Sequence, residues 1–170
     1  MNLRYFLLTI LVLLITTSIV LIFFSKNKLN HKKQVTEQLA IIPKIPGVPI
    51  GSNNNTNWEY TRKSTIIQFF NSECHHCQNE ATAIFNKLEA FKNVNLLFVS
   101  EEVESNILAF SIEYKLDNQP NIWWLKMKPK DVYNTFGNIG VPHFWVYNKE
   151  GNLVKEFRGE TKVEALLEWL

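Results

Sequence analysis

The chain has 170 residues, enough for one domain with attachments, and its 12 Phe, 5 Trp and 5 Tyr can fill an apolar core. Its 18 basic and 16 acidic residues give a net charge of +2, and no basic stripe is present, so we expect no nucleic-acid partner. Two cysteines cannot form a multi-bridge disulfide scaffold, and they indicate either a reactive pair or half of a metal site.

The N-terminal segment Tyr5–Phe24 carries no charge, and its only polar residues are three threonines and one serine. Twenty helical residues at about 1.5 Å each span the roughly 30 Å hydrocarbon core of a bilayer. The segment is longer than the apolar part of a signal peptide, has no Ala-x-Ala-like exit and is not followed by a cysteine for lipid attachment. We therefore predict a transmembrane anchor over residues 1–25, with residues 5–24 in the membrane.

The charges on either side of this anchor bear on its orientation. Arg4 and the terminal amine precede it, and four lysines follow it at positions 26, 28, 32 and 33. The positive-inside bias alone would place the C-terminal domain in the cytoplasm. A membrane tether for a reactive cysteine pair would be most useful on the oxidising, periplasmic or extracytoplasmic side. The two indications disagree, and the orientation stays open at this point.

Residues 26–57 have the composition of a linker. A polar, basic stretch leads to three prolines, at positions 43, 46 and 49, and then to the Asn-rich segment 52–57. The prolines disfavour helix and favour extended chain. An edge strand around Ile41, Ile42 and Ile45 is compatible with this pattern.

From Trp58 onward, strand-like and helix-like segments alternate. Thr65–Phe70 is β-rich and mostly apolar, which predicts a buried central strand, and residues 95–99 predict a second one. Between them lies one predicted amphipathic helix, whose apolar face consists of Ala81, Ile84, Phe85, Leu88 and Phe91.

The alternation continues to the C-terminus. In chain order we predict a helix over 103–114, a strand over 122–125, a helical turn over 131–136, a strand over 144–147, a turn over 148–152 and a strand over 153–157. Residues 161–164 (TKVE) match a capping box and open a last helix, with an inward stripe of Val163, Leu166, Leu167 and Leu170. The pattern predicts an α/β domain over residues 58–170, with a mixed central sheet flanked by helices.

Cys74-His75-His76-Cys77 lies between the first central strand and its helix, with Ser72 as the predicted N-cap. Unpaired N–H groups and the helix dipole favour a thiolate at this position, and the thiolate is the nucleophile. Two intervening residues bring the second sulfur within bonding range of the first. We predict that Cys74 attacks, that Cys77 resolves the mixed disulfide, and that His75 and His76 stabilise the Cys74 thiolate.

A CxxC pair is also compatible with half of a zinc site. His75 and His76 are too close in sequence to complete a tetrahedron easily with both cysteines, which leaves His31 and His143 as further ligands. The strand, the CxxC, the amphipathic helix and the later Val141-Pro142 together favour a redox pair that needs no cofactor.

These motifs resemble the thioredoxin superfamily. The resembling segments are IIQFFNSECHHC, then GNIGVPHFWVYNKEGNLVKEFRG, then the closing helix. The resemblance implies a thioredoxin fold, a cis peptide bond at Pro142, and substrate binding by the backbone of Val141. The additional helix and strand between about Val103 and Leu125 are similar to the insertion of the membrane-anchored TlpA/ResA-like group.

That group implies a thiol–disulfide oxidoreductase at the bacterial cytoplasmic membrane. Its partners would be protein thiols or disulfides, including those of apocytochromes c in cytochrome c maturation, together with a membrane redox donor or acceptor.

The chain departs from the thioredoxin pattern in two places. Gln68 stands where thioredoxins carry a buried acid, so either Glu73, Glu80 or His76 assists Cys77, or no residue does. Glu73 itself replaces the usual tryptophan before the first cysteine. A histidine immediately before the second cysteine is similar to strongly oxidising Dsb-type pairs, so the direction of electron flow stays open.

Two other functions, copper delivery and peroxidase activity, agree less well with the sequence than disulfide exchange does. A copper-delivery protein of the same fold would bind Cu(I) through Cys74, Cys77 and His143, whose ligand types suit a soft metal. Relatives of that kind, however, carry CxxxC. A peroxidase is disfavoured because Asn71 replaces the threonine of the Thr-x-x-Cys motif.

Overall fold

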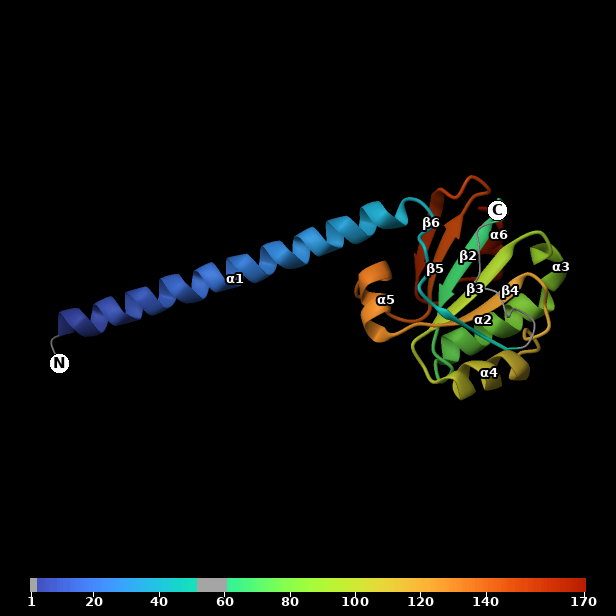
Figure 1. The fold of residues 1–170 in the computed structure, drawn as a ribbon, viewed down its shortest axis with the longest axis horizontal. Helices are drawn as coiled ribbons and strands as arrows, with labels where there is room; N and C mark the ends of the chain where they lie inside the picture. The colour runs from blue at the N-terminus through green and yellow to red at the C-terminus, as the bar shows by residue number, and fades with distance from the viewer. Residues whose placement is uncertain (1–2, 52–60) are drawn as a thin grey trace. The chain divides into compact units, whose positions relative to one another are not determined.

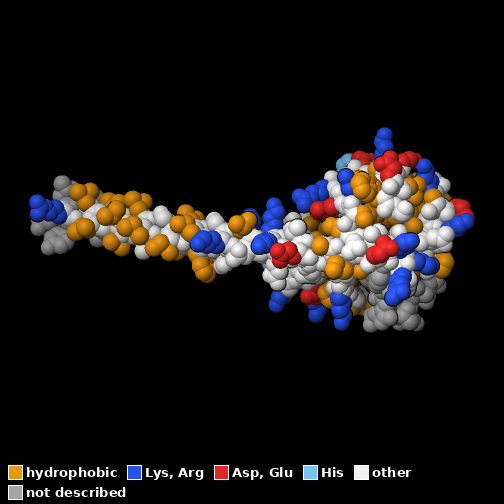
Figure 2. All heavy atoms as spheres, turned by 90° about the horizontal axis from the view of Figure 1, so that it is seen from above, with side chains coloured by type: hydrophobic (Ala, Val, Ile, Leu, Met, Phe, Trp, Pro, Cys, Tyr) orange, Lys and Arg blue, Asp and Glu red, His pale blue; other side chains and the backbone are white. Residues whose placement is uncertain are grey.

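The computed structural model describes residues 3–51 and 61–170 and divides into two units, residues 1–37 and 38–170. The first unit is formed by helix α1, Leu3–Leu39, which extends two residues into the second unit (Figure 1). Apolar side chains surround the N-terminal part of α1, with lysines beyond them (Figure 2). Among the described residues, α1 alone is long and apolar enough to cross a membrane, a property that anchors share with signal sequences.

The predicted linker differs from the structure in its first part. α1 continues through residues 26–39 because this stretch contains strong helix formers and no Pro or Gly, and it ends before Pro43. The edge strand forms later than expected, at β1 (Val48–Ile50). Ile41 makes only an isolated bridge, to Asn152. Residues 52–57 lie outside the described residues.

The second unit contains a six-stranded mixed sheet in the order β1-β4-β3-β2-β5-β6. β2, β3 and β4 are parallel, and β1, β5 and β6 join antiparallel to their neighbours. The strands after β1 are β2 (Thr65–Phe69), β3 (Asn95–Ser100), β4 (Ile122–Lys126), β5 (His143–Tyr147) and β6 (Leu153–Arg158). All residues of β2, β3 and β5 are buried, which confirms β2 and β3 as the predicted buried strands.

The helices of this unit follow the predicted order with local differences. They are α2 (His75–Asn86), α3 (Leu88–Phe91), α4 (Glu104–Glu113), α5 (Pro129–Phe136) and α6 (Val163–Leu167). The predicted single helix through Phe91 is interrupted at Lys87, whose backbone is not helical. α4 and β4 are the predicted additional helix and strand, and β4 widens the sheet beyond β3.

The predicted capping box is wrong. The N-cap of α6 is Lys162, without a side-chain cap, because the Thr161 hydroxyl donates to the carbonyl of Gly159 instead (3.0 Å). Of the predicted inward stripe, Val163 and Leu166 are buried, whereas Leu170 is exposed.

The two sheet faces carry different helices. Buried residues of α2, α4 and α6 share one apolar cluster with Phe144 and Val146 of β5. Because side chains alternate along a strand, His143 and Trp145 point to the opposite face, where Trp145 stacks on Phe136 of α5 (centroids 4.5 Å apart). The CxxC helix therefore packs on the face opposite α5.

Candidate active site

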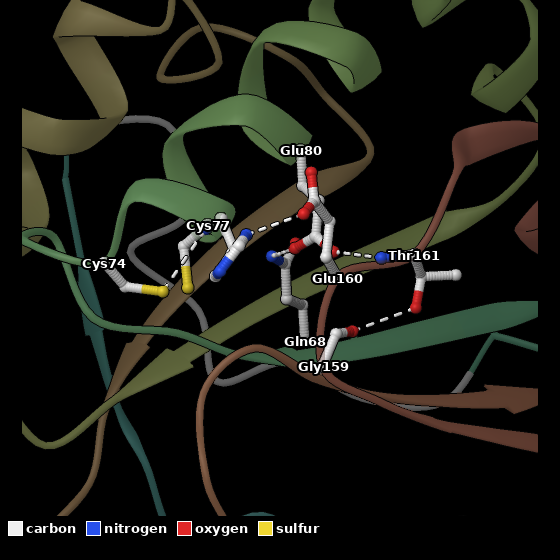
Figure 3. Close-up of polar contacts among 8 residues, drawn as sticks. Gln68, Cys74, Cys77, Glu80, Gly159, Glu160 and Thr161 are labelled. Carbon is white, nitrogen blue, oxygen red and sulfur yellow. Dashed lines mark hydrogen bonds and ion pairs between the residues drawn. The ribbon is translucent and has the colours of Figure 1, made fainter.

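Cys74 and Cys77 lie where β2 passes into α2. Cys74 is itself the N-cap of α2, with extended backbone, and its Sγ accepts the N–H of Cys77 at 3.4 Å (Figure 3). Cys74 is half-buried, Cys77 is fully buried, and both are free thiols. The predicted arrangement of an outer and an inner cysteine at a helix start is present. The predicted N-cap at Ser72 is wrong, because the helix begins only after Cys74.

Ser72 instead belongs to a hydrogen-bond network that fixes the loop before Cys74. Its N–H and its hydroxyl both donate to the Glu102 carboxylate at 2.7 Å, and the hydroxyl of Ser100 donates to the same group at 3.2 Å. Gln78 of α2 donates to the carbonyl of Ser72 at 2.8 Å. Sequence reasoning missed Glu102. Its position just after a parallel strand, at the sheet edge where the cysteines lie, was the available signal.

His75 and His76 form the first two positions of α2, between the two cysteines in sequence. Both are exposed, with ring centroids 6.4 Å apart. His76 Nδ1 lies 2.7 Å from Glu160 Oε2, and among the described contacts neither imidazole hydrogen-bonds to Cys74. A protonated His76 would therefore be paired with a carboxylate, and the effect of the histidines on the Cys74 thiolate stays a prediction.

Glu80 supplies the buried carboxyl group that is absent from position 68. It lies one helical turn after Cys77, is only 3% exposed, and accepts a hydrogen bond from Gln68 Nε2 at 3.1 Å. Of the other predicted substitutes, Glu73 is exposed and His76 is bound to Glu160. Burial raises the pKa of Glu80 from its ordinary value of 4.5 to about 8, although the N–H of Thr161 opposes this.

Cys77 is held in its thiol form by its surroundings. Burial, and then the adjacent Cys74 sulfur, raise the pKa of Cys77 far above its ordinary value, and the charge on Glu80 acts in the same direction. A buried thiol of this kind needs a nearby base before it can react as a nucleophile.

The Val141–Pro142 peptide bond is cis, as the resemblance implied. Pro142 directly precedes β5, whose first residue is paired in register with Phe69 at the end of β2. The proline therefore lies at the sheet edge from which the chain continues to Cys74. Pro142 is buried, whereas Val141 is 36% exposed and presents an apolar side chain at the surface.

His143 is not brought together with the cysteines. It is 3% exposed, stacks on Trp145 with centroids 4.2 Å apart, and places Nε2 2.7 Å from the Glu156 carboxylate. Burial lowers the pKa of His143 even though Glu156 opposes this. The described residues contain no group of three His, Cys, Asp or Glu side chains that could hold a metal ion. His143 therefore does not form a copper site with Cys74 and Cys77. It does not form a zinc site with them either.

No protein-family model and no curated protein matches the sequence. Solved structures do match. A secreted Mycobacterium tuberculosis disulfide oxidoreductase homologous to E. coli DsbE is 14% identical, with a TM-score of 0.59 over 79% of this chain and 98% of that one. StoA from Bacillus subtilis is 22% identical, with a TM-score of 0.53 over 64% and 83%.

A copper protein is also similar. ScoI of Arabidopsis thaliana with copper bound is 15% identical, with a TM-score of 0.52 over 72% of this chain and 93% of that one. The chain thus has the thioredoxin fold, which is found in thiol–disulfide oxidoreductases and in a copper-binding protein. The chemistry has to be argued from the residues of this site.

Proposed function

We propose that the protein is a thiol–disulfide oxidoreductase that acts on protein disulfides through Cys74 and Cys77. The observation that carries this proposal is the pairing of a half-buried sulfur at the N-cap of α2 with a buried sulfur one turn further along. The outer sulfur is accessible to a protein substrate and accepts a hydrogen bond from the N–H of Cys77. The test is whether a Cys77→Ala variant traps substrate proteins as mixed disulfides.

The proposed reaction has two exchange steps. The Cys74 thiolate attacks a substrate disulfide, forms a Cys74–substrate disulfide and releases one substrate thiolate, which takes up a proton. Cys77 then gives its proton to the ionised form of Glu80, and the Cys77 sulfur attacks the Cys74 sulfur. The second substrate sulfur leaves as a thiolate and takes up the proton held by Glu80, and the substrate gains two electrons while the Cys74–Cys77 pair becomes a disulfide.

Glu80 is the proposed proton acceptor in the second step. Its side chain is on the same face of α2 as Cys77 and is held by Gln68. The primary amide of Gln68 can present either a donor or an acceptor, so it can pair with Glu80 in both protonation states. A pKa of about 8 keeps Glu80 a strong enough base to compete for a thiol proton.

The substrate is proposed to bind beside Cys74, against the exposed Val141 and the cis bond to Pro142. The exposed apolar side chain and the backbone before the proline offer a short extended edge to a peptide. This role for Val141 and Pro142 stays a prediction from the resemblance.

Electron flow is proposed to run from this protein to its substrate, with a membrane dithiol donor restoring the reduced pair. Support comes from His76, which lies 2.7 Å from Glu160 and makes no hydrogen bond to Cys74 among the described contacts. We expect the Cys74–Cys77 couple to have a reduction potential below about −200 mV, measured in glutathione redox buffers. A potential near about −120 mV would instead identify an oxidant.

Helix α1 is proposed to anchor the domain to the outer side of the bacterial cytoplasmic membrane. The support is its apolar length, together with the usefulness of disulfide chemistry in an oxidising compartment. In intact cells, a membrane-impermeant maleimide should label Cys74 in a Cys77→Ala background. Labelling only after the cells are permeabilised would place the domain in the cytoplasm, as the lysine distribution alone suggests.

A further inference from the structure

Each residue of the segment 159–161 contacts a different part of the candidate active site, and Figure 3 shows one of these contacts, between Thr161 and Glu80. The three contacts are the N–H of Gly159 to the carbonyl of Pro142 at 2.9 Å, Glu160 Oε2 to His76 Nδ1 at 2.7 Å, and the N–H of Thr161 to Glu80 Oε1 at 2.7 Å. Three consecutive residues thereby connect the cis-proline, the first turn of α2 and the buried carboxyl group.

The local backbone explains how one segment reaches all three parts. Gly159 has φ of +85°, a left-handed conformation that lets the chain turn sharply after β6. The Thr161 hydroxyl closes the turn by donating to the carbonyl of Gly159. Glu160 is therefore held between two anchored neighbours, and its side chain extends towards α2.

The carboxylate of Glu160 also faces Glu80. Both line a groove of about 560 Å³ between α2 and the segment that leads into α6. The charge on Glu160 opposes ionisation of Glu80 and adds to the effect of burial on its pKa. The other titratable or charged groups around Glu80 are Cys77 and His76 of α2, Lys162 before α6, and Glu164 of α6 with its partner Lys87.

We propose that Glu160 is a positioning residue for disulfide exchange, because its carboxylate binds His76 of α2 and lies in the same groove as Glu80. The inference rests on the proposed thiol–disulfide exchange. Glu160 contacts neither sulfur. It acts on the second step of that reaction, in which Cys77 gives its proton to Glu80 and then attacks Cys74.

The test is the pH dependence of this second step in the full-length chain in detergent micelles. After mixing with a disulfide-bonded peptide, formation of the Cys74–Cys77 disulfide is followed by acid quench between pH 5 and 9. In Glu160→Gln the midpoint should move to lower pH by at least about 0.3, a twofold change in the acid dissociation constant of Glu80. An unchanged midpoint, with the rate lowered equally at every pH, would contradict the proposal. Glu160 would then only stabilise the conformation of the segment 159–161.

Two further variants make the result specific. Glu164→Gln removes another carboxylate from the same groove, one that is paired with Lys87, and should leave the midpoint in place. An equal shift in Glu164→Gln would overturn the proposal, because any charge in the groove would then suffice. His76→Asn leaves Glu160 without its partner and should move the midpoint to higher pH, an effect that should shrink in the Glu160→Gln background.

A readout that does not depend on turnover separates this inference from the proposed function. With ¹³C-labelled glutamate, the carboxyl signal of Glu80 is the one that disappears in Glu80→Gln, and its titration should shift to lower pH in Glu160→Gln. If Cys77→Ala traps no substrate but this signal shifts, the proposed function fails and the electrostatic role of Glu160 stands. If trapping succeeds and neither the signal nor the kinetic midpoint shifts, the inference alone is wrong.

Discussion

Cys77→Ala should accumulate disulfide-linked complexes with substrate proteins in cells, and these complexes should disappear on a non-reducing gel after treatment with dithiothreitol. Cys74 is half-buried at the helix start and can still attack, whereas the buried sulfur that normally releases the substrate is gone. Turnover of disulfide substrates should fall on the order of 100-fold or more, because the covalent intermediate is no longer resolved.

The matched control is Cys74→Ala, which keeps the inner cysteine and removes the outer one. It should trap nothing, because Cys77 is 0% exposed and its pKa is raised by burial. Equal trapping by both single variants would show that the two sulfurs have no fixed order of attack. Trapping by neither variant, accompanied by stoichiometric binding of Cu(I), would favour a copper function.

The parts of this fold that are local in sequence could be predicted. β2, the CxxC and the start of α2 follow one another within about 15 residues, and each carries its own pattern of β-rich, cysteine or amphipathic residues. The cis-proline followed from the resemblance. The continuation of α1 to Leu39 was not predicted. The prolines from Pro43 onward restrict only their immediate neighbours, so residues 26–39 are free to form helix.

The contacts that complete the site could not be predicted in this way. Glu80 meets Thr161 across 81 positions, and His76 meets Glu160 across 84. Such pairings depend on how α2 packs beside the end of β6, and no periodicity encodes that. His143 is a different case. Phe144 is apolar and was expected to face the core. Because side chains alternate along a strand, His143 could have been predicted to point to the other face.

Glu80→Gln should stabilise the protein above about pH 5 while slowing the second exchange step. In the folded state Glu80 keeps its proton up to about pH 8, whereas in the unfolded chain it loses the proton near its ordinary value of 4.5. The folded state therefore binds more protons between these values, and the free energy of unfolding falls as pH rises through this window. Below about pH 4.5 both states are protonated, and the group has no such effect.

The size of the gain follows from the same pKa difference. The interval from 4.5 to about 8 corresponds to at most roughly 5 kcal/mol at pH 8 and above, and a gain of about 2–3 kcal/mol is expected once the site relaxes. A glutamine can still accept from the N–H of Thr161 and can donate to Gln68 Oε1, which has no partner among the described residues. Few hydrogen bonds are therefore lost.

Urea unfolding of the full-length chain between pH 4.5 and 8.5 measures this difference. His143 contributes in the opposite direction, because its folded pKa is lowered and the unfolded chain binds more protons below about pH 6.5. That contribution is common to both proteins and cancels when the variant is compared with the wild type. Glu89→Gln is the matched control, since this side chain is 83% exposed beside Lys92, and it should leave the pH dependence unchanged.

Glu80→Gln should slow the second exchange step although it stabilises the protein. Glutamine cannot accept the proton of Cys77, so closure of the Cys74–Cys77 disulfide should slow by about 10²-fold while the first attack by Cys74 is preserved. A stable variant with full activity would mean that the Cys77 proton leaves by another route. A variant less stable than the wild type at about pH 6–7 would mean that burial does not keep Glu80 protonated in the fold. A buried carboxyl group that costs stability and is retained for proton transfer agrees with both expected results.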